Sequence, residues 1–512
     1  MKGISSYYQN ERIIFFTAAC ISVLLSIWSA CSESVINPDA ICYLLSAEAI
    51  ARSGWFAVIH NTCPQANWPF YSILIFALSH VVSLSYLVSA YLLDGLFSLI
   101  SVITFICIVK ELGGSKRVLY LAMLVILASH EFNSVRQYIV RDHGYWAFYL
   151  LSVFFLLKYA RNVQWVDVCG FYLSLLIATL FRIEGVIFLL VVPFVFLLLP
   201  SLSFQQRLKC FITLYTPLFI ICFVLAVWYL LHSATTHFGR LLEVIYQIRH
   251  GLILMLASFQ SAKIGLAQHV LAPEAARDAG MLLFLGLVIW YIVYAMINLS
   301  WGYVCLVIYA CYHRVMSYKQ DVLWIISTYL LVNVGITFVF FTQHLFLSKR
   351  YLIALSLMFM LFVPFALDTL CARFAEYRAR VFLIFSIFFI IFSTIGGIVN
   401  FGYSKNYIRE AGDWIVHHVP DNASLYVNDY QLMYYSKHFN ENIFQIFPIY
   451  LHINILQNEQ WKQYDYLALR LDKQHMTKAM SFISLLRIKP EKLFVNRRGD
   501  GVVIYKTREK MS

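Results

Sequence analysis

An acidic residue stands directly after the first hydrophobic segment, in a stretch that is too polar to cross a membrane. Asp39 follows Asn37 and Pro38, and Asn at the N-cap with Pro at the first helical position predicts a helix start. At about 100° per residue, Asp39, Tyr43 and Ile50 share one helical face, away from the most apolar stripe. The sequence therefore predicts an amphipathic helix in the membrane interface, with a carboxylate that can accept a proton from a hydroxyl group.

Further ionisable and aromatic residues fall near the ends of later hydrophobic segments, on the side of the membrane predicted for Asp39. Ionisable groups at membrane depth cost free energy, so they are candidates for function. Asp142 is a second candidate for a catalytic acid. The candidates for contact with a substrate or its phosphate are Tyr43, Arg141, His143, Arg182, Glu184, Lys349, Arg350 and Tyr351.

Several of these residues also have a purely structural interpretation. In a structural interpretation, Asp39 would only cap the start of its helix, as acidic residues commonly do. A surface ion pair would explain the adjacent Arg141 and Asp142, and the polar turn of a helical hairpin would explain Arg182 and Glu184. The sequence leaves these alternatives open.

The composition is that of a chain embedded mostly in lipid. Of the 512 residues, 61% are hydrophobic and only 13% are charged, a balance that excludes an ordinary soluble domain. The net charge of +12 comes from basic residues scattered over short loops, so the positive-inside bias explains it better than nucleic-acid binding does. Lys349 and Arg350 run against this bias, which favours an anionic partner on the outer side.

Repeated apolar runs predict an all-α polytopic membrane protein with about eleven crossings between Ile13 and Ile398. The basic turn at residues 110–117 is expected in the cytoplasm, which places the N-terminus inside and the C-terminus outside. Phe70–Ser83 is short for a crossing and is expected to be re-entrant or interfacial. Residues 232–280 are expected to form a long outer loop, and residues 281–311 a tilted or split crossing.

From Phe401 onwards the sequence has the composition of a small soluble α/β domain. We therefore predict a membrane-embedded domain over residues 1–400 and an extracytoplasmic domain over residues 401–512. The second domain is expected to contain a helix over 405–419 and strands over 424–428, 442–447, 466–471 and 502–505.

The cysteines give no sign of a metal centre, because no CxxC pair or zinc-type spacing occurs. Most of them lie inside apolar runs, where cysteine is usually a small buried hydrophobe. Cys42 and Cys63 share the first loop. A disulfide between them would require that this loop faces an oxidising compartment.

The order of these features resembles the membrane glycosyltransferases of the GT-C superfold, specifically the bacterial relatives of protein O-mannosyltransferases and of lipid A aminoarabinose transferase. In two places the sequence departs from that pattern: Ala40 stands where a second acid often occurs, and a Lys and one Pro are missing before Phe70. The segments that carry the resemblance are DAICY at 39–43, AEAIARSGW at 47–55, NWPF at 67–70, RDH at 141–143, SKRY at 348–351, and the tail around 407–414 and 464–470.

The resemblance implies transfer of a monosaccharide from a polyprenyl-phosphate donor to an acceptor hydroxyl on lipid, glycan or protein. Asp39 would be the base, the reaction would invert the sugar, and cationic side chains would stabilise the leaving phosphate. No cofactor is expected to be required, although Asp39 and Asp142 together could hold a divalent cation. The expected location is a bacterial inner membrane, with the active site and C-terminal domain on the periplasmic side.

Two other functions fit the same layout. A transporter or flippase of lipid-linked sugars would place ionisable groups near the bilayer midplane, and Asp94 is the chief residue of that kind. A polysaccharide polymerase or ligase would use the same outer-face chemistry with a different acceptor.

Overall fold

The chain forms two compact units. The computed structural model describes residues 2–54, 68–232, 239–316, 320–437, 460–476 and 489–507. One unit, which we call the helical unit, comprises Met1–Trp28, Leu92–Arg136 and Arg141–Val399. The other, the mixed unit, comprises Ser29–Tyr91, Gln137–Val140 and Asn400–Ser512. Residues near the N-terminus therefore fold together with the C-terminal segment.

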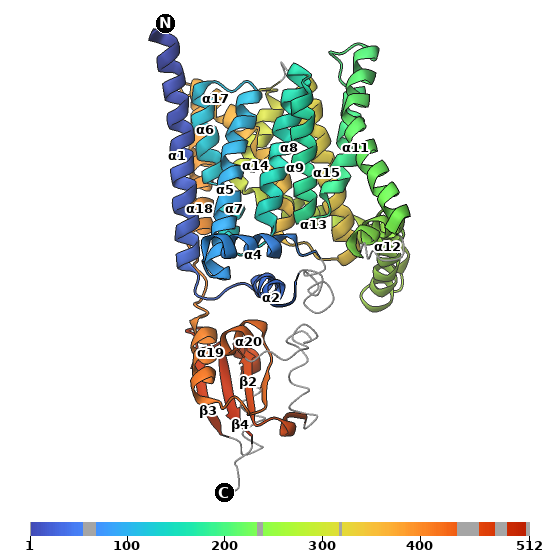
Figure 1. Cartoon of the computed structure of the whole chain (residues 1–512). Helices are drawn as coiled ribbons and strands as arrows, with labels where there is room; N and C mark the ends of the chain where they lie inside the picture. The colour runs from blue at the N-terminus through green and yellow to red at the C-terminus, as the bar shows by residue number, and fades with distance from the viewer. Residues whose placement is uncertain are drawn as a thin grey trace. The chain divides into compact units, whose positions relative to one another are not determined.

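Long helices that run side by side make up the helical unit (Figure 1). The helices α1 and α5 begin or end in the mixed unit. The elements are α1 (Lys2–Ser32), α5 (Tyr86–Glu111), α6 (Lys116–Leu127), α7 (His130–Ser134), η2 (Val135–Gln137), α8 (Asp142–Asn162), α9 (Trp165–Phe181), α10 (Gly185–Val191), η3 (Val192–Leu197), α11 (Phe204–His232), α12 (Gly239–His269), η4 (Ala276–Asp278), α13 (Ala279–Leu299), α14 (Trp301–Tyr312), α15 (Gln320–His344), η5 (Lys349–Leu352), α16 (Ile353–Met360), α17 (Val363–Ala372) and α18 (Tyr377–Ile398).

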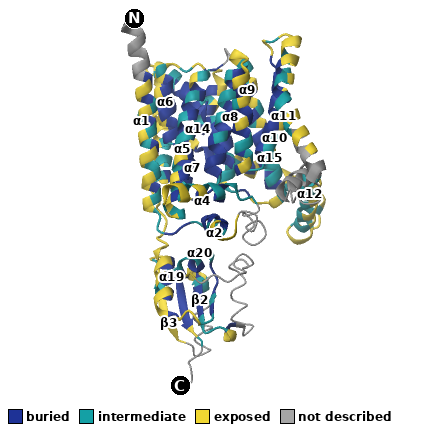
Figure 2. Cartoon of the chain, in the orientation of Figure 1, coloured by how far each residue is buried: buried dark blue, intermediate teal, exposed yellow. Residues whose placement is uncertain are grey.

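Length and composition make this a multi-pass membrane protein. Within the described residues, 5 helices are long and apolar enough to cross a membrane, or up to 7 if two bent pairs each count as one crossing. Figure 2 shows exposed residues along the outermost helices, and in α18 these include Phe388 and Phe392, which are 62% and 70% exposed. Large apolar side chains that face outwards suit a lipid environment. The predicted all-α polytopic class is confirmed, whereas the count of about eleven crossings stays a prediction.

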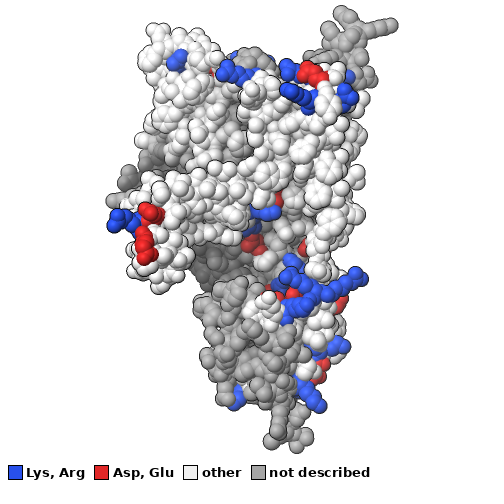
Figure 3. Space-filling model, turned by 180° about the vertical axis from the view of Figure 1, so that it is seen from behind, with Lys and Arg blue, Asp and Glu red and all other residues white. Residues whose placement is uncertain are grey.

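One end of the helical unit is tied together by ion pairs between its turns. Lys110 binds Glu11 at 2.6 Å, and Arg161 binds Glu111 at 3.0 Å. Figure 3 shows charged side chains gathered at this end and a broad, nearly uncharged band beside them. The start of α1 and the predicted cytoplasmic turns that follow α5 and α8 therefore lie at one end of the bundle.

Helices α12, α13 and α14 and the short helix α4 (Phe70–Val82) lie in segments for which the sequence made specific predictions. Residues 232–280 were expected to form a long outer loop with one interfacial piece at 252–258, whereas Gly239–His269 forms one continuous helix, α12. The long segment at 281–311 is split as expected: α13 and α14 meet at Ser300, whose φ is 71°. Helix α4 has 13 residues, fewer than a simple crossing needs.

The mixed unit contains α2 (Pro38–Ser53), α4 and a small α/β domain. The domain elements are α19 (Asn406–His418), β1 (Leu425–Val427), α20 (Tyr430–Ser436), η8 (Gln460–Gln463), β2 (Tyr466–Leu471), β3 (Pro490–Val495) and β4 (Gly501–Lys506). The sheet order is β1-β2-β4-β3. Strands β1 and β2 are parallel, and β4 is antiparallel to both of its neighbours.

Alternating side chains of the central strands fill an apolar core on each face of this sheet. Val502 and Ile504 pack with α19 and α20 on one face, and Val503 and Tyr505 pack against Trp461 on the other. This two-residue period is typical of a strand buried on both faces. The predicted C-terminal α/β fold is thus confirmed, although β3 was missed and the expected strand at 442–447 lies outside the described residues.

Candidate functional site

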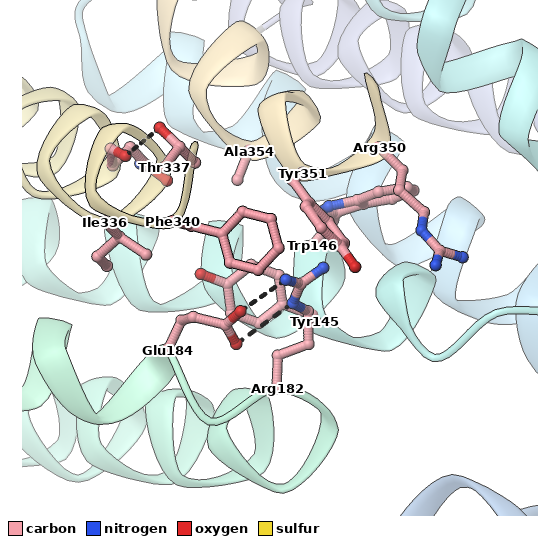
Figure 4. Close-up of a pocket in the computed structure, with 11 residues that line it drawn as sticks. Tyr145, Trp146, Arg182, Glu184, Ile336, Thr337, Phe340, Arg350, Tyr351 and Ala354 are labelled. Carbon is pink, nitrogen blue, oxygen red and sulfur yellow. Dashed lines mark hydrogen bonds and ion pairs between the residues drawn. The ribbon is translucent and has the colours of Figure 1, made fainter. Parts of the chain in front are cut away.

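A buried arginine in the turn between two helices organises the site. Helix α9 ends at Phe181 and α10 begins at Gly185, so Arg182 and Glu184 occupy the turn between them. The Nη1 of Arg182 donates to the Asp142 carboxylate at the start of α8. Its Nη2 donates to Glu184 at 2.6 Å, and Figure 4 shows this Arg182–Glu184 pair. The Arg182 side chain is only 12% exposed. Arg182, Asp142 and Glu184 therefore form one ion-pair network.

The Arg182 guanidinium also lies over two aromatic rings. Its Cζ lies 4.4 Å from the centroid of the Tyr351 ring and 5.7 Å from that of Tyr145. Tyr351 comes from η5, whereas Tyr145 lies one turn into α8. Cations over aromatic faces are stabilised electrostatically, so three separate segments of the helical unit fix the orientation of one side chain.

The side chains of Arg182 and Glu184 in this turn stabilise each other in their ionised forms. Burial by itself would raise the pKa of Glu184, but the Arg182 guanidinium holds that pKa below its usual value. Burial would likewise lower the pKa of Arg182, but the carboxylates of Glu184 and Asp142 raise it well above the ordinary value. An acid bound in this way is a weak proton acceptor, because its negative charge is already stabilised.

Two more arginines bring positive charge to the same place. Arg141 and Arg350 lie close enough that their charges act on the Asp142 carboxylate. The Nη1 atom of Arg141 is buried and has no hydrogen-bond partner within the part of the chain that the structure describes. Buried donors are nearly always paired in native proteins, so this atom points to a ligand that accepts hydrogen bonds.

The network lines a cavity of about 550 Å³ whose walls are partly charged and mostly apolar. Its charged or polar lining comes from Arg141, Arg182, Glu184, Gln343 and His344. Its apolar lining includes Ile183, Ile187, Val191, Leu252, Val332, Ile336, Val339 and Phe340. A volume of this size is typical of a site for a small organic ligand.

A smaller hollow of about 30 Å³ adjoins this cavity and shares Arg182, Glu184 and Tyr351 with it. Asn333 and Thr337 of α15 also line the hollow, and neither was among the residues predicted from the sequence. Their signal was available: two polar residues four positions apart share a helical face inside an otherwise apolar crossing.

Besides Asp142, two predicted residues of the helical unit, Lys349 and His143, line neither the cavity nor the smaller hollow, and Arg350 lines only the hollow. The Nζ atom of Lys349 lies 2.8 Å from the Glu131 carboxylate. His143 is buried, with Nδ1 at 3.3 Å from the Ser98 hydroxyl and Nε2 at 3.2 Å from the Val135 carbonyl oxygen. Both side chains therefore have structural partners.

Asp39 and Tyr43 belong to the mixed unit and not to the helical unit that contains the cavity. Asp39 lies in the first turn of α2, as predicted. Tyr43 is buried, with its ring centroid 5.0 Å from that of Tyr71 in α4. Cys42 is disulfide-bonded, and its expected partner Cys63 lies outside the described residues.

Within the described residues, no group of three or more His, Cys, Asp or Glu side chains is placed to hold a metal ion. Asp142, which the sequence offered as a ligand for a divalent cation, instead accepts a hydrogen bond from Arg182.

The comparison with known proteins decides the fold. No family model matches this chain, and no curated protein matches it by sequence. The crystal structure of ArnT from Cupriavidus metallidurans bound to undecaprenyl phosphate aligns over 98% of both chains, with a TM-score of 0.51 and 11% identity. The chain has the GT-C fold.

Two further structures align less closely. ArnT from the same organism in the apo state covers 98% of both chains at a TM-score of 0.42 and 12% identity. The oligosaccharyltransferase of Archaeoglobus fulgidus tethered with an acceptor peptide covers 86% of this chain and 59% of its own, at a TM-score of 0.45 and 13% identity. The fold assignment rests on the first structure.

Proposed function

We propose that this protein is a glycosyltransferase that moves a monosaccharide from a polyprenyl-phosphate donor to an acceptor hydroxyl on lipid, glycan or protein. The observation that carries the proposal is the cavity of about 550 Å³, which combines two arginines with a largely apolar lining. A lipid phosphate has the same division into an anionic head and an apolar tail. The GT-C fold, which the chain shares with an ArnT bound to undecaprenyl phosphate, supports it.

Arg141 is the residue best placed to bind the donor phosphate directly. Its Nη1 donor is buried and unpaired within the described residues, whereas the guanidinium of Arg182 is already engaged by two carboxylates. Arginine binds phosphate through several donors at once. Three arginines facing two carboxylates leave one positive charge in excess, which suits the charge of a phosphate diester.

The same arginines would stabilise the leaving group as the glycosidic bond breaks. Negative charge then develops on the lipid phosphate, and preorganised cationic donors in a water-poor site stabilise that charge strongly. Asp142 holds Arg182 by an ion pair, so we assign it the role of a positioning residue rather than that of a base. Since arginines already supply positive charge, we expect no divalent cation to be required.

Asp39 is the proposed base that takes the proton from the acceptor hydroxyl as that oxygen attacks the anomeric carbon. It lies in the first turn of α2 and is partly exposed, as a group must be if it is to meet an acceptor. A direct attack by the acceptor inverts the configuration at the sugar. The disulfide-bonded Cys42 in the same helix favours the oxidising, outer side of a bacterial inner membrane.

Mass spectrometry of lipids and glycans from a strain that lacks this protein tests the proposal. We expect one glycoconjugate to lose a sugar and the corresponding polyprenyl-phosphate sugar to accumulate. Unchanged glycoconjugates and lipid-linked sugars would contradict the proposal.

A transporter of lipid-linked sugars is the alternative, because Asp94 is buried within α5 and only 3% exposed. In that case Asp94→Asn would impair function more than Asp39→Asn does. If the protein were a polysaccharide polymerase or ligase, the strain that lacks it would make glycans of altered chain length.

A further inference from the structure

The residues that lead into α2 are part of the core of the C-terminal domain. Val35 and Ile36 are 2% and 5% exposed. Val35 belongs to the same apolar cluster as Tyr407 and Ile408 of α19 and Leu432 of α20. A segment from the beginning of the chain therefore completes a core whose other members lie beyond residue 400.

Both backbone groups of Ile36 are bound by side chains of α20. Its N–H donates to the Tyr435 hydroxyl at 3.1 Å, and its carbonyl oxygen accepts from the Gln431 side-chain amide at 2.6 Å. Gln431 is 3% exposed, and its own carbonyl oxygen accepts from Arg470 at 2.7 Å. Arg470 is in turn held by Asp429 at 2.6 Å, so the amide that binds Ile36 has a fixed orientation.

Asn37, the next residue, is bound by Ile139, which belongs to another segment of the mixed unit. Asn37 occupies the N-cap position of α2, but its side chain makes no cap hydrogen bond. It instead accepts from the Ile139 N–H at 2.9 Å and donates to the Ile139 carbonyl oxygen at 3.2 Å. Three consecutive residues, 35–37, are thus held immediately before the turn that carries Asp39.

We propose that the C-terminal domain is a clasp that positions α2, with Gln431 and Tyr435 as the positioning residues that fix Ile36 and thereby Asp39. Helix α20 also packs against α2, so the clasp acts on the helix and on the chain that enters it. This inference rests on the proposed function only for its kinetic consequence. A base that must be within hydrogen-bond reach of its substrate loses rate when its support loosens.

Hydrogen–deuterium exchange and steady-state kinetics of the full-length protein test the clasp in two variants. Tyr435→Phe removes only the hydroxyl that binds Ile36, and Gln431→Ala removes the amide. In both, we expect the peptide that contains Ile36 to exchange faster. We also expect kcat to fall about tenfold while the KM for the donor stays the same, because misplaced groups cost rate.

Tyr403→Phe is the matched control, since Tyr403 is 59% exposed, and it should change neither measurement. Unaltered exchange at Ile36 in both variants would overturn the clasp, as would faster exchange with an unaltered kcat. If the wild-type protein transfers no sugar, the proposed function fails. The exchange experiment would then still support or overturn the clasp by itself.

Discussion

At the scale of single residues, Arg182 and Arg141 play different parts although both are arginines near the same acid. Arg182 is buried with Asp142 and Glu184, and replacing it would leave two carboxylates without their cation. Breaking such a buried pair commonly costs about 3–5 kcal/mol. Arg141 carries the buried donor that the described residues leave unpaired, so its replacement tests ligand binding with less damage to the fold.

Arg141→Ala should raise the KM for a polyprenyl-phosphate sugar strongly, because the phosphate loses charge-assisted hydrogen bonds worth about 1.5–3 kcal/mol, roughly 10- to 100-fold in affinity. Donor titration with the purified variant measures this. Arg161→Ala is the control, since Arg161 is 58% exposed and pairs with Glu111 at the opposite end of the helices. Equal affinities in the two variants would show that Arg141 does not bind the donor.

At the scale of helices and strands, the sequence predicted the elements whose pattern is strong and missed those whose pattern is mixed. Tyr466–Leu471 was predicted with its observed ends because apolar residues dominate it. Strand β3 begins at Pro490 with charged neighbours and is largely exposed, as an edge strand often is. Helix α12 was read as a loop because polar and basic residues interrupt its apolar runs.

For the site, too, the sequence predicted individual residues but not the contacts between residues that are far apart in the chain. The sequence identified Arg182, Glu184 and Asp142 as candidates from their position at helix ends, but no pattern shows that they share one network. That pairing depends on how α8 packs against α9, where the ring of Phe181 fills the space beside Gly144. Lys349 was expected at the phosphate because its type fits, yet its partner Glu131 lies more than two hundred positions earlier.

Gly144→Ala should disturb this packing, because a Cβ at Gly144 would overlap the Phe181 ring. Phe181 directly precedes Arg182, so its displacement moves the ion-pair network. Overpacking of this kind costs about 1–3 kcal/mol, and we expect a lower unfolding temperature together with a lower kcat. Thermal unfolding in detergent and transfer assays measure both. Gly286→Ala, with nothing within 4 Å of its Cβ, should behave like the wild type.

At the scale of the whole molecule, we propose that the reaction takes place on the outer side of the membrane. Ion pairs join the predicted cytoplasmic turns at one end of the helical unit, and Arg182, Asp142 and Glu184 come from turns of the opposite assignment. A multi-pass protein with basic turns at one end inserts with that end in the cytoplasm. The donor site would then face outwards.

Single cysteines in a background without other reactive cysteines test this orientation. A membrane-impermeant maleimide added to intact spheroplasts should label Tyr403→Cys, which is exposed in the mixed unit, and should not label Arg378→Cys before lysis. Labelling only at residue 378 would reverse the topology and exclude an outer-face reaction.

A comparison of Asp39→Asn with the wild-type protein in one assay tests most directly whether Asp39 is the catalytic base. The asparagine keeps the size of the side chain but cannot accept the acceptor proton as a carboxylate does. We predict that purified Asp39→Asn binds a polyprenyl-phosphate sugar with wild-type affinity and transfers no measurable sugar. Wild-type transfer by Asp39→Asn would contradict the account.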